Sequence, residues 1–360
     1  MKSLQITEQG QHTLNEIFSQ PQCWSACLSK LAASTELRVA AQLARPGAEW
    51  IFVGCGTSYY LAQAASSSFN YLKLAARAVP SSDLLMYPAL TLQSGRNYIP
   101  IVISRSGRTS EAVQAAQVLE KDYNLRTIAI TCADAQPLES ECSVTLKLLD
   151  ADEQSTVMTR SLTSMLLGLQ YLGAIISGND SFGQGLLDLP QQIEPLLKDI
   201  PQSLRLFAGS RSFSDFVFLA QGPLFGIASE CMLKVTESSC SYAQVFHSLE
   251  FRHGPKSIAG PQTLITFLMS ETSYDAEVEL LEEMKALGAA TMVIANCVDS
   301  RAQRASDFAI ELALRSPEYT RPAAFAIWGQ LYGVYYGLKK GLNPDSPKNL
   351  TRVVELADRP

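Results

Sequence analysis

Hydroxyl side chains are concentrated in one short stretch of the chain, residues 104–110. The stretch reads Ser-Arg-Ser-Gly-Arg-Thr-Ser, and its hydroxyl residues are Ser104, Ser106, Thr109 and Ser110. Hydroxyl groups donate hydrogen bonds to anions, and Gly107 lets the backbone approach a ligand closely. We therefore predict a cradle for the phosphate group of a small ligand, with Arg105 or Arg108 adding positive charge. The alternative interpretation is that these side chains only cap the helix near Glu111.

The elements on either side of this stretch can place its hydroxyls around an anion. The apolar residues 101–103 precede it and a helix-forming sequence follows to about Asp122, so the order predicts a buried strand, a tight turn and a helix. The first N–H groups of a helix lack partners within it, and the helix dipole favours a negative charge there. The predicted turn thus adds backbone donors to the side-chain hydroxyls.

A second glycine turn follows the strand predicted at residues 50–53. Its sequence, Gly-Cys-Gly-Thr-Ser at residues 54–58, resembles the start of a dinucleotide-binding fingerprint, but Tyr59 stands where the third glycine should be. Since no convincing acidic partner for a ribose follows either, we expect no nucleotide cofactor. Ligands of open parallel sheets lie beyond the C-terminal ends of the strands, so we expect Thr57 and Ser58 beside the Ser104 turn.

Candidate proton-transfer groups lie in the second half of the chain. Glu230, Lys234 and Glu237 are spaced four and three residues apart, which puts them on one face of a helix. They form either an exposed ion-pair stripe or a site in which a carboxylate with a tuned pKa acts as a general base. His253, one of 3 histidines, precedes a Gly-Pro turn and either moves protons or caps the preceding helix. So few histidines exclude a polyhistidine metal centre.

The two halves of the chain repeat one α/β plan. After helices at residues 11–46, the first half is expected to hold strands at 50–53, near 76–83, at 101–103, 127–132 and 144–148, alternating with helices. Apolar runs of the first half recur in the second half at an almost constant distance along the chain. Gly222 lies 166 residues after Gly56, and Cys297 lies 165 residues after Cys132. This agreement predicts duplication of a parallel-sheet unit. Because residues 270–273 of the second copy hold a carboxylate and no glycine, we expect one phosphate site per chain, in the first copy.

The composition is typical of a globular protein with more than one domain. The chain has 360 residues, of which 47% are hydrophobic and 18% charged, and its net charge is −6. That charge argues against nucleic-acid binding, which relies on lysine and arginine. No apolar run reaches the ~20 residues that span a bilayer, and the N-terminus turns polar too early for a signal peptide, so we expect a cytoplasmic protein outside membranes.

In this combination and order, the motifs at 54–58, 104–110, 230–237 and 252–255 resemble the double sugar-isomerase (SIS) domain family. That family includes the isomerase half of glucosamine-6-phosphate synthase, aminosugar-6-phosphate deaminases, ketosamine-6-phosphate deglycases and tagatose-6-phosphate isomerase-like proteins. The resemblance implies an α/β fold with two tandem parallel-sheet, three-layer, flavodoxin-like sandwiches. The expected segments are an N-terminal helical segment (1–46), a phosphate-binding SIS domain (47–185), a helical linker (186–204), a second SIS domain (205–340) and a C-terminal tail over the active site (341–360).

The family pattern also implies roles for individual residues. The residues expected to hold the sugar phosphate are Ser58, Ser104, Arg105, Ser106 and Thr109, and those expected to line the substrate pocket are Gly56, Thr57 and Thr159. Glu237 would move a proton between C1 and C2, with Lys234 near it. His253 would open the sugar ring. In the family this histidine comes from the neighbouring subunit, which implies a homodimer.

One tail position departs from the pattern of the synthase. Residues 347–352 resemble the segment that folds back over the site, but Arg352 stands where the synthase has a lysine. An arginine stays protonated and does not readily form a Schiff base with a ketose. We therefore expect Arg352 to contact the substrate as a fixed cation.

Together these features predict an enzyme that acts on a hexose 6-phosphate carrying an amino group. The specific prediction is conversion of glucosamine 6-phosphate to fructose 6-phosphate and ammonia, with no metal and no redox cofactor. No glutaminase domain precedes the first SIS domain in this sequence, so we do not expect the glutamine-dependent synthase reaction. The alternatives are a ketosamine-6-phosphate deglycase, an aldose–ketose phosphosugar isomerase, a sugar-phosphate sensor without turnover, and a dehydrogenase, which would bind nicotinamide.

Overall fold

A computed structural model describes residues 9–356 of the chain. These residues form two compact units, and we name each after the central strand of its sheet. The β1 unit consists of Gln20–Glu153, Arg160–Pro190 and the described part of Thr351–Pro360. The β6 unit consists of the described part of Met1–Ser19, Gln154–Thr159 and Gln191–Leu350.

Parallel strands form the sheet of the β1 unit. They are β1 (Glu49–Gly54), β2 (Ala76–Pro80), β3 (Tyr98–Ile103), β4 (Ile128–Thr131) and β5 (Val144–Lys147). Their order across the sheet is β2-β1-β3-β4-β5, and Val53 of β1 pairs with Val102 of β3. Because the order of addition reverses between β1 and β3, the C-terminal ends of these two strands flank the topological switch point, where such sheets bind ligands.

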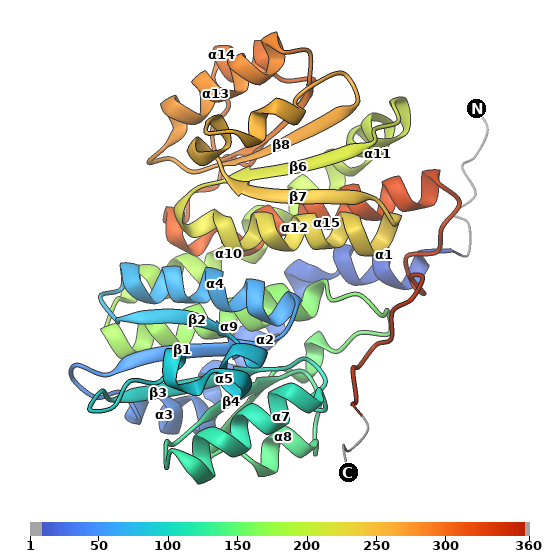
Figure 1. The fold of residues 1–360 in the computed structure, drawn as a ribbon. Helices are drawn as coiled ribbons and strands as arrows, with labels where there is room; N and C mark the ends of the chain where they lie inside the picture. The colour runs from blue at the N-terminus through green and yellow to red at the C-terminus, as the bar shows by residue number, and fades with distance from the viewer. Residues whose placement is uncertain (1–8, 357–360) are drawn as a thin grey trace. The chain divides into compact units, whose positions relative to one another are not determined.

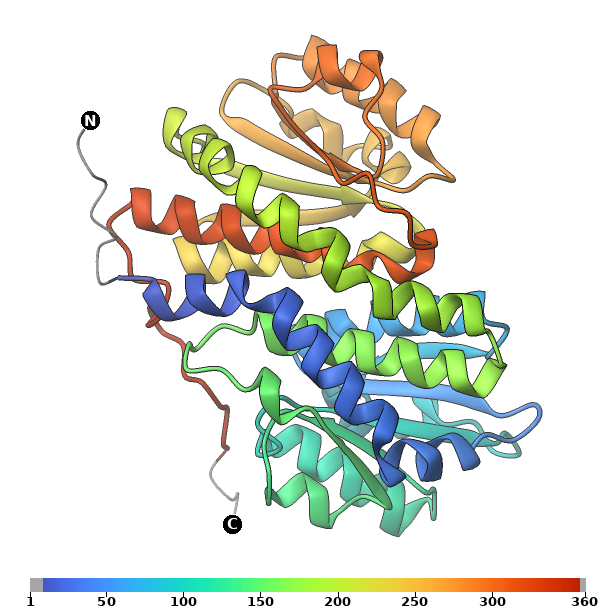
Figure 2. The same cartoon turned by 180° about the vertical axis from the view of Figure 1, so that it is seen from behind.

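Helices cover both faces of this sheet (Figure 1). They are α2 (Gln20–Ala33), α3 (Thr35–Gln42), α4 (Thr57–Tyr71), α5 (Ser81–Met86), α6 (Pro88–Thr91), α7 (Ser110–Gln117), α8 (Pro137–Ser140) and α9 (Arg160–Ser177), with a π-helical turn η1 (Val118–Asp122) and a 3₁₀ turn η2 (Leu149–Ala151). The side chains of β1 alternate between the two faces. Ile51 and Val53 join a core with α5, α7 and α8, whereas Phe52 packs edge-on against Phe69 of α4. Helix α9 packs against α4 and α2 (Figure 2).

The sheet of the β6 unit repeats this arrangement. Its strands are β6 (Asp215–Ala220), β7 (Tyr242–His247), β8 (Thr263–Met269), β9 (Ala290–Ala295) and β10 (Phe308–Glu311). Their order is β10-β9-β8-β6-β7, all parallel. Numbered along the chain within the unit, this is the same order as in the β1 unit, with the switch point between β6 and β8. Duplication of one α/β unit would give both sheets the same strand order, as observed.

Helices also cover both faces of the β6 sheet. They are α1 (Gln11–Phe18), α10 (Asp180–Asp199, which begins in the β1 unit), α11 (Pro201–Ser210), α12 (Phe225–Ser239), α13 (Tyr274–Ala286), α14 (Ser300–Ala305) and α15 (Pro322–Lys339), with 3₁₀ turns η3 (Gly222–Leu224), η4 (Leu249–Arg252), η5 (Pro255–Ile258) and η6 (Glu318–Thr320). Val217 joins a core with α13 and α14, whereas Phe216 packs edge-on against Tyr336 of α15. Within residues 9–356, no helix is both long and apolar enough to cross a bilayer.

The structure confirms the predicted fold class of two parallel-sheet α/β sandwiches. The compact units nevertheless divide the chain differently from the predicted segments, because the helices of residues 1–46 do not pack together as one body. Helix α1 packs on α15, and the N–H of Thr13 donates to Asp345 at 2.8 Å, all within the β6 unit. Helices α2 and α3 contact α9 in the β1 unit. The turn expected near Asp83 is instead the short helix α5.

Candidate functional site

The turn after β3 lies at the switch point of the β1 unit. Gly107 has a φ of 64°, and its N–H donates to the carbonyl (3.3 Å) and the Oγ (3.1 Å) of Ser104. A Cβ on Gly107 would lie 2.7 Å from Cβ of Gln136, so both the conformation and the space require glycine. Thr109 is the N-cap of α7, but its side chain makes no capping hydrogen bond. The capping interpretation therefore fails for Thr109.

The predicted hydroxyls of this turn lie close to one another. Ser104 is buried, and its Oγ lies 3.5 Å from Oγ1 of Thr109. The Oγ of Ser106 accepts a hydrogen bond from the N–H of Arg108 at 3.2 Å. These bonds hold the hydroxyl oxygens in a fixed arrangement on one turn, as a preformed anion cradle requires.

The turn after β1 supplies the other predicted cradle residues. Gly56 has a φ of 53° and precedes α4, whose first two residues, Thr57 and Ser58, are buried. A Cβ on Gly54 would lie 2.7 Å from the main chain of Ser58, so glycine allows the helix to begin this close to the strand. Because β1 and β3 are adjacent parallel strands, both turns lie at one edge of the sheet, as the sequence predicted.

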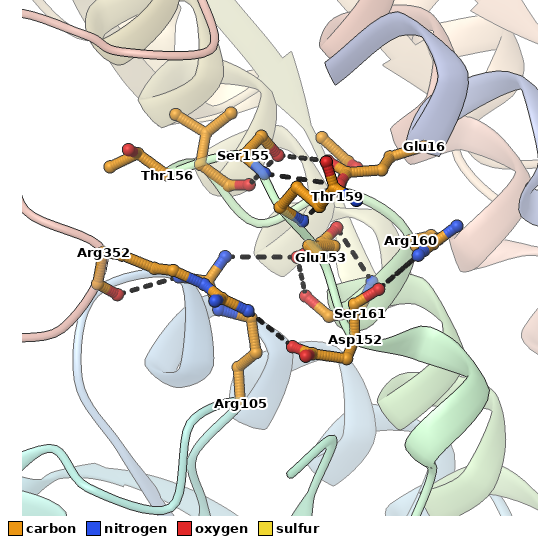
Figure 3. A network of polar contacts seen from close by, with 12 residues as sticks. Glu16, Arg105, Asp152, Glu153, Ser155, Thr156, Thr159, Arg160, Ser161 and Arg352 are labelled. Carbon is orange, nitrogen blue, oxygen red and sulfur yellow. Dashed lines mark hydrogen bonds and ion pairs between the residues drawn. The ribbon is translucent and has the colours of Figure 1, made fainter. Parts of the chain in front are cut away.

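Arg105 is held by an acidic partner that sequence reasoning missed (Figure 3). Its side chain is only 5% exposed, and Nη1 lies 3.2 Å from Oε2 of the buried Glu153. Glu153 also accepts hydrogen bonds from the N–H and the hydroxyl of Ser161. A buried ion pair is retained when further donors satisfy the carboxylate, and that condition is met here. Arg105 is therefore already paired with Glu153, and any contribution it makes to phosphate binding is made from within this ion pair.

The C-terminal segment, residues 351–356, lies against the same turn within the β1 unit. Nη2 of Arg105 donates to the carbonyl of Arg352 at 2.8 Å, and the guanidinium of Arg352 lies 2.6 Å from Asp152 (Figure 3). Two hydrogen bonds join the segment to the first residue of α7: the Ser110 N–H donates to the Val354 carbonyl (3.2 Å), and the Leu356 N–H donates to Ser110 Oγ (2.9 Å). In the turn before α7, Arg108 pairs with Glu355 at 2.6 Å. The predicted fixed cation Arg352 is thus paired with a carboxylate of its own unit.

The candidate proton-transfer residues of the β6 unit lie on α12. Lys234 is 1% exposed, and its Nζ lies 3.3 Å from the buried carboxylate of Glu230 and still closer to Glu237, which is largely buried. Burial acts to lower the pKa of Lys234, but the two carboxylates outweigh it and raise the pKa above its usual value. The exposed ion-pair interpretation is therefore wrong. The ammonium remains charged and fixes the carboxylate of Glu237.

Helix α12 is held in place by a stripe of glycines on α15. Gly329, Gly333 and Gly337 recur at every fourth position. A Cβ at these positions would lie 2.2 Å from Sγ of Cys231, 2.8 Å from the carbonyl of Lys234 and 2.1 Å from the carbonyl of Ser238, respectively. Only glycine therefore lets the two helices approach this closely, and the contact fixes the main chain that carries Lys234 and Glu237.

His253 lies between the 3₁₀ turns η4 and η5 of the β6 unit. Its N–H donates to the carbonyl of Glu250 at 3.0 Å, and the following Gly254 has a φ of 126°. The imidazole is exposed. The preceding residue, Arg252, forms an ion pair of 2.8 Å with Glu283 of α13. The structure thus presents this histidine on a surface segment whose backbone is fixed by short turns.

Thr159, the remaining predicted pocket residue, is fully buried in the β6 unit. Its carbonyl accepts a hydrogen bond from the side-chain amide of Gln330 at 3.2 Å. The segment Gln154–Thr159 is held by the buried carboxylate of Glu16, which accepts hydrogen bonds from the main chain and side chain of Ser155 (Figure 3). Nothing in the local sequence identified Glu16, which lies on α1.

Comparison with known proteins is consistent with this geometry. A model of the SIS domain matches residues 45–174 and again residues 214–332. The chain belongs to the SIS domain family. The two matched stretches contain the sheets of the β1 unit and the β6 unit.

Curated relatives of this SIS-domain chain include two D-galactosamine-6-phosphate deaminases named AgaS. That of Shewanella sp. (strain ANA-3) is 28% identical over 361 residues, which cover 95% of this chain and 89% of the relative. That of Escherichia coli is 26% identical over 377 residues, which cover 96% and 94%. A probable glutamine–fructose-6-phosphate aminotransferase of Acanthamoeba polyphaga mimivirus is 26% identical over 318 residues, 84% of this chain but 50% of the relative. The chain thus spans about half the length of the aminotransferases it matches.

Solved structures share the fold of this SIS-domain chain. Tagatose-6-phosphate ketose/aldose isomerase from Escherichia coli has a TM-score of 0.85 and 23% identity, with 97% of each chain covered. Glucosamine-6-phosphate deaminase from Thermotoga maritima has a TM-score of 0.76 and 27% identity, with 96% of this chain and 100% of that one covered.

Proposed function

We propose that this chain is a phosphosugar-processing enzyme, an aminosugar-6-phosphate deaminase and isomerase. The proposed reaction converts glucosamine 6-phosphate and water to fructose 6-phosphate and ammonia. The observation that carries this proposal is the similarity to two AgaS deaminases, which extends over at least 95% of this chain and 89% of either relative. The Glu230–Lys234–Glu237 cluster supports it, because burying two of its charges and most of the third is costly for a merely structural stripe.

Phosphate binding is assigned to the switch point of the β1 unit. Ser58, Ser104, Ser106 and Thr109 would donate hydroxyl hydrogen bonds, with Arg105 as a neighbouring cation held by Glu153. Gly56 and Thr57 would line the substrate pocket of this unit, and Arg352 would add a second fixed cation. The glycine-dependent turn and the failure of Thr109 to cap its helix support this assignment.

Proton transfer is assigned to the β6 unit. His253 would assist opening of the sugar ring. Glu237 would then take the proton from C2 and return it to C1, which leaves an imine at C2 that water hydrolyses to the ketose and ammonia. Lys234, fixed between two carboxylates, would keep Glu237 in position.

We further propose a homodimer in which each site uses His253 of the partner subunit. The exposure of the imidazole supports this assignment. The test mixes two inactive variants, Glu237→Gln and His253→Asn, under conditions that exchange subunits. Mixed dimers would regain one site with both native groups, so activity should recover to about a quarter of the wild-type value. No recovery, with subunit exchange confirmed, would reject the shared site.

A substrate panel tests the reaction itself. The protein is incubated with glucosamine, galactosamine and ketosamine 6-phosphates, and released ammonia or amine is measured beside fructose 6-phosphate formation. Ammonia release from an aminohexose 6-phosphate, lost in Glu237→Gln, is the expected result. Release of an amine only from ketosamine phosphates would identify a deglycase instead. Tight binding of a sugar phosphate without turnover would identify a sensor.

A further inference from the structure

Glu277 is a buried carboxyl group at the C-terminal edge of the β6 sheet. It lies on α13 and is 0% exposed. Its Oε2 accepts hydrogen bonds from the N–H of Ser270 (3.2 Å) and the hydroxyl of Ser273 (2.8 Å), both in the turn after β8. Ser270 is as far from Ser104 along the chain as Gly222 is from Gly56, so the two serines correspond in the two copies. In this unit an internal carboxyl group therefore occupies the position where the β1 unit is expected to receive an external anion.

The other oxygen of Glu277 reaches a different segment of the same unit. The hydroxyl of Ser248 donates to Oε1 at 2.5 Å. Ser248 directly follows β7, and its N–H donates to the carbonyl of Ala220 at the end of β6 (3.1 Å). It is also the first residue of the stretch 248–258, which contains η4, His253 and η5 and which we name the His253 segment. Glu277 thus joins the end of β8 to the start of the His253 segment.

Other contacts fix the same segment to α13. Phe251 is fully buried in a core with Val278 and Leu281 of that helix. Arg252 pairs with Glu283, further along the same helix, in a contact that is partly open to solvent. Among the described polar contacts of the segment with α13, the Ser248–Glu277 bond is the fully buried one. Water screens the exposed Arg252–Glu283 ion pair but does not reach the buried hydrogen bond, so this bond should hold the segment more firmly than the ion pair does.

We propose that Glu277 is a positioning residue for His253, acting through Ser248. The proposal rests on the proposed function, in which His253 opens the sugar ring. The proposal gives the two switch points different roles. The one in the β1 unit is assigned to anion binding, whereas the one in the β6 unit anchors the His253 segment. A displacement of about 1 Å in a catalytic group typically lowers turnover on the order of a hundredfold, so an anchor of this kind has a measurable effect.

Two serines allow the positioning role to be separated from simple stabilisation. Ser248 and Ser273 each donate one hydroxyl hydrogen bond to Glu277, but only Ser248 belongs to the His253 segment. Ser248→Ala and Ser273→Ala each remove one hydroxyl hydrogen bond from the same carboxyl group, and Ser273→Ala also removes the contact of that hydroxyl with Ser270 Oγ at 2.7 Å. A structural role predicts similar effects of the two variants, whereas a positioning role predicts a large effect of Ser248→Ala alone.

The experiment measures kcat, KM, thermal unfolding and amide hydrogen exchange of residues 248–258 for both variants. Ser248→Ala should lower kcat at least about tenfold with little change in KM, and it should speed exchange in the segment. Ser273→Ala should keep kcat within about twofold of wild type at a similar unfolding temperature. Glu283→Gln, which removes only the exposed ion pair, serves as a second control.

Equal losses of kcat in both serine variants, or unchanged exchange in Ser248→Ala, would overturn the proposal. If the wild-type protein released no ammonia from any substrate tested, the proposed function would fail on its own. The exchange measurement would still decide whether Glu277 anchors the segment, because it requires no turnover.

Discussion

The turns after β3 and β8 occupy the same place in two sheets with the same strand order, yet they are built differently. After β3, Gly107 at φ 64° closes the turn, and hydroxyls of Ser104 and Thr109 face each other. After β8, the turn contains no glycine, and Glu277 fills it with a carboxyl group that Ser270 and Ser273 bind. The difference shows that a topological switch point offers a set of hydrogen-bond donors. The chain either leaves these donors for a ligand or pairs them with one of its own side chains.

This comparison implies a division of labour between the units. In the proposed function, anion binding is assigned to the turn after β3, and proton transfer is assigned to the Lys234–Glu237 pair and the His253 segment of the β6 unit. Variants that affect only one of these tasks test the division most directly.

The largest effect is expected from Glu237→Gln, which removes the proposed proton carrier. Turnover should fall about 10²- to 10⁴-fold, because that is the usual contribution of a general acid–base group. Affinity for the sugar phosphate should remain close to wild type, since phosphate binding is assigned to the other unit. Steady-state kinetics and calorimetric titration measure the two quantities. The exposed Glu279→Gln on α13 is the control, and a collapse of affinity in Glu237→Gln would contradict the division.

A carboxylate introduced into the first turn should make it resemble the second. Ser106→Glu places a negative charge in the predicted cradle, and like-charge repulsion should weaken sugar-phosphate affinity on the order of a hundredfold. Thr272→Glu, at the corresponding position after β8, should leave KM unchanged. Kinetics of both variants provide the measurement. Equal effects at the two positions would show that the turns do not differ in function.

The buried carboxyl group of the second turn should make stability depend on pH. Burial raises the pKa of Glu277 to about 7, despite hydrogen bonds from Ser248 and Ser273 that act to lower it. From about pH 4.5 to 7 the folded protein keeps a proton that the unfolded chain has released. The free energy of unfolding should therefore fall as pH rises through this range, relative to Glu277→Gln, by up to ~1.4 kcal/mol per pH unit.

Denaturant unfolding of wild type and Glu277→Gln across this pH range provides the measurement. Because every other titrating group is shared, the difference between the two curves isolates Glu277. Parallel curves would show that the carboxyl group has an ordinary pKa.

The smallest effect concerns the glycine that distinguishes the turns. Gly107→Ala forces an L-residue into a left-handed conformation and places a methyl group 2.7 Å from Gln136, so the protein should lose about 1–3 kcal/mol of stability. Gly209→Ala in α11 meets open space and should be neutral or slightly stabilising. Thermal unfolding compares the two. Equal stability would show that the turn after β3 tolerates a side chain.

Patterns that are local in sequence predicted most of the architecture. Apolar runs followed by glycine turns located the central strands, and the regular spacing between matching turns in the two halves revealed the two copies. The spacing of Glu230, Lys234 and Glu237 placed them on one helix face but left their burial open. Burial was decided by α15, whose glycine stripe covers α12 although the two helices are far apart in the sequence.

By itself, the sequence determined the alternation of strands and helices, the position of the glycine turns and the lack of a glycine at residues 270–273 of the second copy. These features depend on hydrophobic periodicity and on the backbone freedom of single residues. Only the tertiary structure decided the partners of the charged side chains: Glu153 for Arg105, Asp152 for Arg352, and Ser248 for Glu277. The physical reason is that a buried charge pairs with a complementary group that folding brings to within about 3 Å. The separation of two residues in the sequence says little about that distance in space.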